Sequence, residues 1–171
     1  MSLSIGEAKN LGFAQYLPTL IPSKVDSCRE IYEENRHRVY SLAFWMTDNE
    51  LAAEELMIDT FYRAFAAKQD ATWDDIDRTF MTVLRECMPL APLTLDCAPC
   101  NQVLSVRRNT LRVELERAVV QLPNTEKLMF LMHDVEGYDH ARIASLLNVS
   151  EDESYRGVHQ ARLRLRELLA N

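Results

Sequence analysis

The most constraining feature of the sequence is the pattern of apolar and helix-ending residues between Asn124 and Ala170. Apolar residues recur there at helical spacing in three successive runs. Gly137 is predicted to end the first helix in a left-handed conformation, and Asn148 to close a short second helix with a positive φ. Ser150 and Glu153 form a capping box for a third, longer helix. Three helices with a tight turn before the last one predict a helix-turn-helix.

Several short motifs within this stretch are more specific than its periodicity. They are Leu122-Pro123, Asp134-Val135-Glu136-Gly137-Tyr138, Ile143-Ala144, Leu147, Val149-Ser150, His159-Gln160-Ala161-Arg162 and Leu165-Arg166-Glu167-Leu168-Leu169. Together they resemble the C-terminal domain of bacterial sigma factors, in particular the small, two-domain extracytoplasmic-function class. In that family the domain docks on the flap of RNA polymerase and lays its last helix into the minus-35 promoter element. The resemblance implies the same two roles here.

The N-terminal half carries a second resemblance, on two predicted helices at Asp26 to Met46 and Glu50 to Ala67. Its motifs are Asn35-Arg36, Arg38-Val39-Tyr40, Leu42-Ala43, Ala53-Glu54-Glu55-Leu56, Asp59-Thr60-Phe61 and Arg63-Ala64-Phe65. They are similar to the sigma-factor segment that binds the clamp helices of the largest polymerase subunit. The resemblance implies a polymerase-binding set of Glu54, Glu55, Leu56, Asp59, Phe61 and Arg63.

A third predicted helix, Asp74 to Met88, begins at a Thr72-x-x-Asp75 cap and departs from the family pattern. Family members use basic and aromatic residues here to open the minus-ten element and hold its bases. The corresponding candidates in this chain are Lys68, Trp73, Arg78 and Arg85, set among Asp70, Asp74, Asp75, Asp77 and Glu86. Nearby carboxylates weaken the attraction to a phosphodiester. Trp73 could stack on a base or belong to the core, and the sequence leaves both readings open.

The start of the last helix departs from the family in the same direction. Where family members have small or hydroxyl residues followed by Lys and Arg, this chain has Glu151, Asp152 and Glu153. These carboxylates stabilise the helix N-terminus and repel a DNA backbone. Gly157 stands where the family commonly has arginine, so we expect an altered DNA-reading surface. The DNA-binding candidates that remain on this helix are Tyr155, Arg156, Gln160 and Arg164.

The acidic charge is concentrated in the first half of the chain. The net charge is −7; residues 30–89 hold 13 acidic side chains against 6 Arg and Lys, whereas residues 107–170 hold 10 of each. An acidic domain suits a basic protein partner better than duplex DNA. The arginines at 107, 108, 112 and 117 could face DNA phosphates or pair with Glu114 and Glu116 on their own helix.

These patterns predict an all-α fold of two small helical bundles joined by a flexible linker, the second bundle containing the helix-turn-helix. The predicted divisions are an N-terminal leader at 1–27, a polymerase-docking and minus-ten domain at 28–88, a proline-marked linker at 89–108 and the helix-turn-helix domain at 109–171. One hypothesis for the free protein is a compact form in which the acidic first domain masks arginines of the second.

Cys97 and Cys100 form a Cys-x-x-Cys pair in the predicted linker. The pair could be half of a zinc site, a reversible disulfide or two incidental thiols, and no further ligands stand at partner spacing. We therefore predict no metal site and no cofactor.

Three hypotheses of function follow. The first is an alternative sigma factor with core RNA polymerase and promoter DNA as partners and an anti-sigma protein as a further candidate. The second is a sigma-like adaptor or decoy that binds polymerase or an anti-sigma protein without reading DNA. The third, an enzyme, has no nucleophile-base pair or phosphate-binding glycine loop to support it. No apolar run is long enough for a membrane span, so we expect a cytoplasmic protein without membrane insertion.

Overall fold

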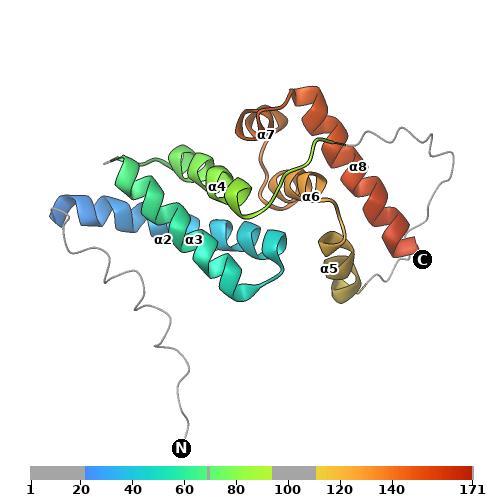
Figure 1. The fold of residues 1–171 in the computed structure, drawn as a ribbon, viewed down its shortest axis with the longest axis horizontal. Helices are drawn as coiled ribbons and strands as arrows, with labels where there is room; N and C mark the ends of the chain where they lie inside the picture. Colours follow the sequence, from blue (N-terminus) through green and yellow to red (C-terminus); the bar gives the residue numbers. More distant parts are fainter. Residues whose placement is uncertain (1–21, 69, 94–110, 171) are drawn as a thin grey trace, which may run out of the picture.

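The computed structural model describes residues 22–68, 70–93 and 111–170, and within them all regular structure is helical (Figure 1). The elements are α2 (Pro22–Thr47), α3 (Glu50–Ala67), α4 (Trp73–Cys87), α5 (Arg112–Val120), α6 (Asn124–Phe130), the π-helical turn η2 (Leu131–Val135), α7 (His140–Leu147) and α8 (Glu151–Ala170). The predicted all-α class is confirmed. In these ranges no helix has the length and apolar run needed to cross a bilayer.

The first bundle consists of α2, α3 and α4. The antiparallel α2 and α3 lie side by side, and α4 packs across α3 (Figure 1). Each helix contributes large apolar side chains to the shared core, among them Val39, Phe61 and Ile76. Within each helix the buried apolar residues recur at helical spacing, which is why periodicity alone predicted all three elements.

The second bundle is organised by α8, which packs against α5, α6 and α7 (Figure 1). Its inner stripe includes Val158, Ala161 and Leu165, all buried. Helices α7 and α8, joined by the short turn at Asn148, form the predicted helix-turn-helix.

The predicted helix ends are confirmed where they depend on local chemistry. The Thr72 hydroxyl accepts from the Asp75 amide while the Asp75 carboxylate accepts from the Thr72 amide. Ser150 and Glu153 form the same reciprocal pair at the start of α8. Asn148 has φ 58° and Gly137 has φ 74°, the left-handed conformations that end α7 and follow η2.

Helical periodicity and capping preferences also predict from the sequence that Leu111, Leu115 and Cys87 point inward and that Asn124 caps a helix, and these details are wrong. Leu111 and Leu115, expected to point inward, are exposed, because only the far end of α5 reaches the core through Ala118 and Val119. Asn124 is the first residue of α6 rather than its cap, and its side-chain amide instead donates to the Pro89 carbonyl at 3.4 Å. Cys87, also expected inside, is exposed at the end of α4.

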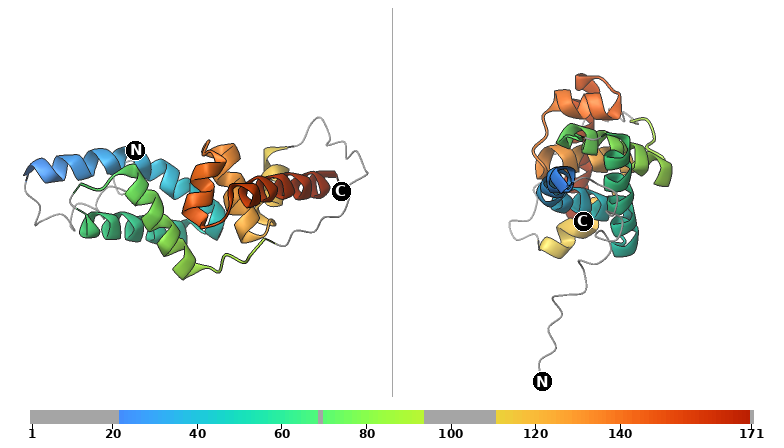
Figure 2. Two further views of the ribbon diagram at one scale, coloured as in Figure 1. Left: turned by 90° about the horizontal axis from the view of Figure 1, so that it is seen from above. Right: turned by 90° about the vertical axis from the view of Figure 1, so that its left-hand side faces the viewer.

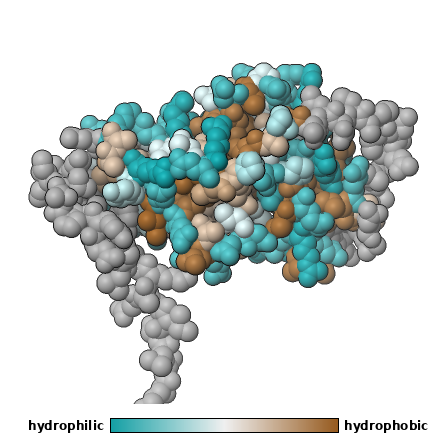
Figure 3. All heavy atoms as spheres, viewed as in Figure 1, coloured by the Kyte–Doolittle hydropathy of each residue, from teal (hydrophilic) through white to brown (hydrophobic). Residues whose placement is uncertain are grey.

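The two bundles pack against each other. Helix α2 contacts α5 and α6, α4 contacts α7, and the buried side chains of both bundles form one continuous hydrophobic cluster. Figure 2 shows the elongated arrangement that results, with α2 reaching one end and α8 the other. On the face seen in Figure 3, hydrophobic residues lie in patches broken by hydrophilic ones. Of the predicted leader at 1–27, residues 1–21 lie outside the described residues, as does most of the predicted linker, whereas residues 22–27 already belong to α2.

The α4 cap makes a prediction about acid stability. Lys68 and two hydrogen bonds from Thr72 hold the pKa of Asp75 at about 2, below its usual 3.8. Because the folded state favours the ionised carboxylate, its stabilising contribution is present above about pH 4 and is lost as the pH falls toward 2. Asp75→Asn should lower the free energy of unfolding at pH 7 by about 1 kcal/mol. It should also flatten the fall in stability between pH 4 and 2, measured by urea unfolding.

Asp70→Asn is the matched control, since Asp70 is exposed and lies just before the cap. An acid unfolding profile of Asp75→Asn that matches the unsubstituted protein would contradict the assignment.

Candidate functional site

The N-terminal turn of α8 is neutralised by its own side chains. Glu151, Asp152 and Glu153 occupy the first three positions of the helix. Glu153 accepts from the Ser150 amide and hydroxyl, both at 2.8 Å, and these bonds lower the pKa of its carboxyl below the usual value. The partial positive charge of this helix end therefore already has carboxylates beside it, as the sequence indicated.

The exposed part of the recognition helix is centred on Tyr155 and Arg156. The Tyr155 ring lies 3.6 Å from the His140 ring, which stacks in turn on His133 at 4.4 Å. His140 also contacts the Ser154 hydroxyl through Nδ1 at 3.0 Å. Arg156 is held by Asp152, one turn earlier, at 2.6 Å. Both candidates project from the helix near its start, where a helix-turn-helix reads DNA.

Further along α8, the predicted DNA-binding residues are less exposed than Tyr155 and Arg156. Arg164 does not lie free on the surface, because its Nε is 2.8 Å from a carboxylate oxygen of Glu126 in α6. Glu126 is only 1% exposed, so this ion pair ties the recognition helix to the bundle core. Gln160 is half-buried between the two regions. The structure thus brings Tyr155 and Arg156 together and gives Arg164 a packing role that helical spacing alone did not reveal.

Gly157 is not part of the reading surface. It is buried, and an added Cβ would lie 2.2 Å from Met129 Sδ in α6 and 3.3 Å from a Leu93 methyl. The expectation that this glycine replaces a DNA-facing arginine is therefore wrong. Its role is to let α8 approach α6 closely.

The α4 candidates are engaged with neighbours on all sides. Lys68 pairs with Asp75 and Arg78 with Asp74, both at 2.8 Å. The Arg142 guanidinium from α7 lies 3.6 Å over the Trp73 ring, which remains half exposed. Arg85 donates to the carbonyls of two residues at the end of α7, at 3.0 and 3.2 Å. Trp73 is thus neither a core residue nor an open stacking platform in this conformation.

The residues implied for polymerase binding on α3 fall into two groups. Leu56 and Phe61 are buried in the core of the first bundle, so packing explains both. Glu55 is exposed, and Glu54 and Asp59 are partly exposed. Arg63 is exposed and bridges Asp59 and Glu86, at 2.8 Å to each.

Sequence reasoning missed an apolar stripe on the outer face of α3. Leu51, Ile58 and Tyr62 are 66%, 43% and 59% exposed and lie seven and four residues apart, on the side opposite the core. Their spacing is a second helical period in the same segment and could have been found. Exposed apolar groups at such spacing, interleaved with carboxylates, are typical of a protein-docking surface.

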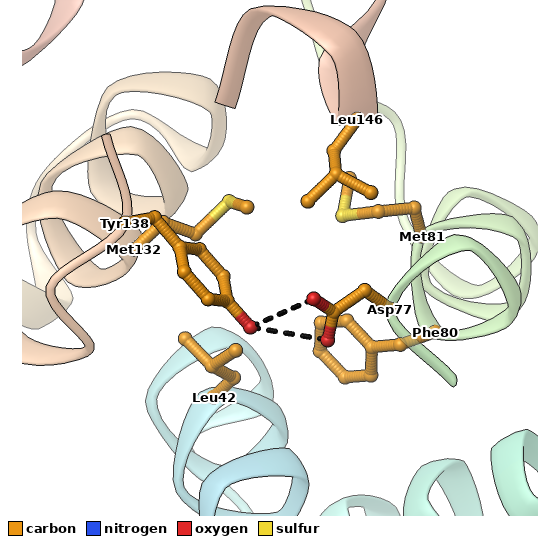
Figure 4. A pocket seen from close by; sticks show the side chains of 7 residues that line it. All are labelled: Leu42, Asp77, Phe80, Met81, Met132, Tyr138 and Leu146. Atoms are coloured by element: carbon orange, nitrogen blue, oxygen red, sulfur yellow. Dashed lines mark hydrogen bonds between the residues drawn. The ribbon is translucent and has the colours of Figure 1, made fainter. Parts of the chain in front are cut away.

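The contact between the bundles contains a buried carboxylate, Asp77 of α4. It pairs with Arg38 of α2 and Arg142 of α7, and it accepts from the Tyr138 hydroxyl at 2.9 and 3.0 Å. Burial raises the pKa of Asp77, while the two arginines act in the opposite direction. Figure 4 shows Tyr138 and Asp77 pointing toward each other across a small pocket lined otherwise by Leu42, Phe80, Met81, Met132 and Leu146.

In the described part of the chain no three His, Cys, Asp or Glu side chains are grouped as a metal site would require. Cys97 and Cys100 lie outside the described residues, so their role stays as the sequence left it.

Comparison with known proteins agrees with this architecture. Residues 112–165, which span α5 to most of α8, match the family model for sigma-70 region 4. Over 93% of its length the chain is 25% identical to the ECF RNA polymerase sigma factor SigE of Mycolicibacterium smegmatis, covering 68% of that protein. The similarity includes both bundles in the same order, which a helix-turn-helix domain alone would not require. By both comparisons the chain resembles a divergent extracytoplasmic-function sigma factor.

Proposed function

We propose that this protein is a sigma factor that binds core RNA polymerase and directs initiation at specific promoters. The observation that carries the proposal is the presence, in one chain, of an exposed apolar stripe on α3 and a helix-turn-helix whose Tyr155 and Arg156 face solvent. The stripe, formed by Leu51, Ile58 and Tyr62, has the character of a protein-docking surface. Because core polymerase is a cytoplasmic enzyme, we propose the cytoplasm as the site of action.

In this proposal each bundle contacts a different promoter element. Tyr155, Arg156 and Gln160 read the minus-35 element from α8, where the acids of the first turn restrict close approach to phosphates. Lys68, Trp73, Arg78 and Arg85 contact the minus-ten element from α4 and the segment before it. Each cation would exchange a carboxylate or carbonyl partner for DNA, so we expect weaker DNA binding by the free protein than by the polymerase complex.

The test is run-off transcription with core polymerase from the source organism and a pool of its own promoter fragments. Specific new transcripts that depend on the protein are expected. Arg156→Ala should reduce promoter affinity roughly tenfold, the usual effect of losing one base contact. Arg166→Ala, an exposed arginine farther along the same helix, is the matched control.

Two outcomes would contradict the proposal. Tight polymerase binding without transcripts from any fragment would favour a sigma-like adaptor or decoy. Equal loss of promoter affinity in Arg156→Ala and Arg166→Ala would show that α8 contributes general positive charge rather than a reading contact.

A further inference from the structure

The contact between the two bundles is built around a charge cluster rather than around apolar packing alone. Asp77 is 3% exposed, although its neighbours in the first turn of the same helix, Asp74 and Asp75, are partly exposed. The second bundle buries it, since two of its partners, Tyr138 and Arg142, come from there. Arg38, the third partner, comes from the first bundle and is itself fixed by Asn35 at 2.7 Å.

The cluster is nearly balanced in charge and closely packed. Both guanidiniums lie over the Tyr138 ring, that of Arg38 at 5.6 Å and that of Arg142 at 5.1 Å from its centroid. Glu136 adds a second carboxylate; burial raises its pKa, and the attraction of Arg38 opposes the rise. Asp74 also lies 3.5 Å from Arg142, so two arginines face three acids. Such a set fixes one geometry for the contact, whereas its desolvation cost leaves little net stabilisation. A contact of this kind is specific and can open.

The same contact engages two of the four side chains proposed for the minus-ten element, Trp73 and Arg85. Arg142 lies on one face of the Trp73 ring while pairing with Asp77. Arg85 is directed into the last carbonyls of α7, those of Leu146 and Leu147. Trp73 could not offer this face of its ring to a base, nor Arg85 its guanidinium to a phosphate, without first losing these partners. The helix that occupies them, α7, is the first helix of the helix-turn-helix.

We propose that the cluster of Arg38, Asp77, Tyr138 and Arg142 is an autoinhibitory latch that holds the free protein closed. When the latch opens, the bundles separate and Trp73 and Arg85 lose their α7 partners, whereas Tyr155 and Arg156 are exposed in the closed form already. The closed arrangement itself is independent of the proposed function, whereas its inhibitory effect rests on it. The apparent affinity for DNA is then lowered, because only the open fraction of molecules offers Trp73 and Arg85.

The variant that tests the latch is Arg142→Glu, because it places a carboxylate against Asp77 and leaves the Arg38 pair within the first bundle intact. Arg166→Glu makes the same charge change at an exposed position of α8 and is the matched control. Small-angle X-ray scattering of the free full-length protein should show a larger radius of gyration for Arg142→Glu only. Its pair-distance distribution should also have a second maximum, from the separated bundles. With Trp45→Phe introduced in both proteins, acrylamide should also quench the fluorescence of Trp73 more strongly in this variant.

Circular dichroism of both variants establishes that the helices are intact. If Arg142→Glu loses helical content, Tyr138→Phe replaces it, since this change removes only the hydroxyl that donates to Asp77. The expected effect has the same direction and is smaller. Scattering profiles of a folded variant that match those of the control would overturn the latch.

The inhibitory effect is measured on the same samples. Free Arg142→Glu should bind promoter DNA roughly threefold or more tightly than the unsubstituted free protein, through its larger open fraction, and polymerase binding of both proteins is measured alongside. Separated bundles with unchanged affinity would overturn the inhibitory role. If neither protein binds polymerase while the scattering still differs, the proposed function fails and the closed arrangement stands.

Discussion

Replacing Tyr62 with alanine is expected to weaken binding to core RNA polymerase by roughly tenfold to a hundredfold. Tyr62 is 59% exposed on α3 and completes the outer stripe with Leu51 and Ile58. Exposed aromatic residues in a contiguous apolar patch are the usual anchors of protein interfaces, and tyrosine is enriched among them. Because the side chain contributes little to the core, the melting temperature should be unchanged. Titration of labelled protein with core polymerase, followed by fluorescence anisotropy, measures the effect.

Tyr155→Ala is a closely matched control. Tyr155 is 58% exposed but lies on the recognition helix of the other bundle. Its removal should leave polymerase affinity within about twofold and weaken promoter binding by the complex, since surface residues outside a hot spot contribute little. If Tyr62→Ala binds core polymerase as tightly as the unsubstituted protein does, the α3 stripe is excluded as the docking surface. Equal losses in both variants would point to a contact that involves both bundles.

A different result is expected one residue earlier. Phe61 is fully buried, and Phe61→Ala should lower the free energy of unfolding by about 3–5 kcal/mol, the usual cost of removing a core aromatic ring. The family motif on α3 includes Phe61 and Leu56 beside exposed residues, so a resemblance by itself does not separate binding from packing. Burial does, and the neighbouring pair Phe61 and Tyr62 makes the separation experimental.

The parts of the fold that the sequence predicted are those that depend on neighbouring residues. The capping pair Thr72 and Asp75 and the left-handed Asn148 are set by interactions within four residues, and apolar periodicity placed most inner faces correctly. Leu111 and Leu115 are the exceptions, since their helix extends beyond the core it was expected to cover. Periodicity shows which residues share a face, not whether anything packs on that face.

The contacts that decide the candidate site are distant in sequence, and no spacing rule reports them. The sequence groups Asp77 with the acids of α4 that would repel DNA. It is in fact buried by Tyr138 and Arg142, which follow it by 61 and 65 positions in the chain. Gly157 was placed on the reading surface by comparison with the family, whereas its missing side chain serves a close approach to Met129. In both cases the residue is buried against an element that is distant in sequence, and only the structure shows this contact.

Arg164 likewise contacts a residue that is distant in sequence, Glu126 of α6. Because its partner Glu126 is almost fully buried, Arg164→Ala would leave a carboxylate inside the second bundle without this ion pair. Removing one partner of a fully buried pair costs about 3–5 kcal/mol. Arg164 is about one third exposed, so solvent screening reduces the expected loss in the free energy of unfolding to about 2 kcal/mol. Urea unfolding measures it.

Arg156→Ala separates this structural role from DNA binding. Its pair with Asp152 is exposed, so its removal should change stability by less than about 0.5 kcal/mol while weakening promoter binding. In Glu126→Gln/Arg164→Ala, the amide no longer carries the buried charge, and the double variant should recover part of the loss seen in Arg164→Ala. Equal stability of the two single arginine variants would place Arg164 on the reading face after all. A stability difference with recovery in the double variant would mean that α8 is anchored at Arg164 and reads DNA near Arg156.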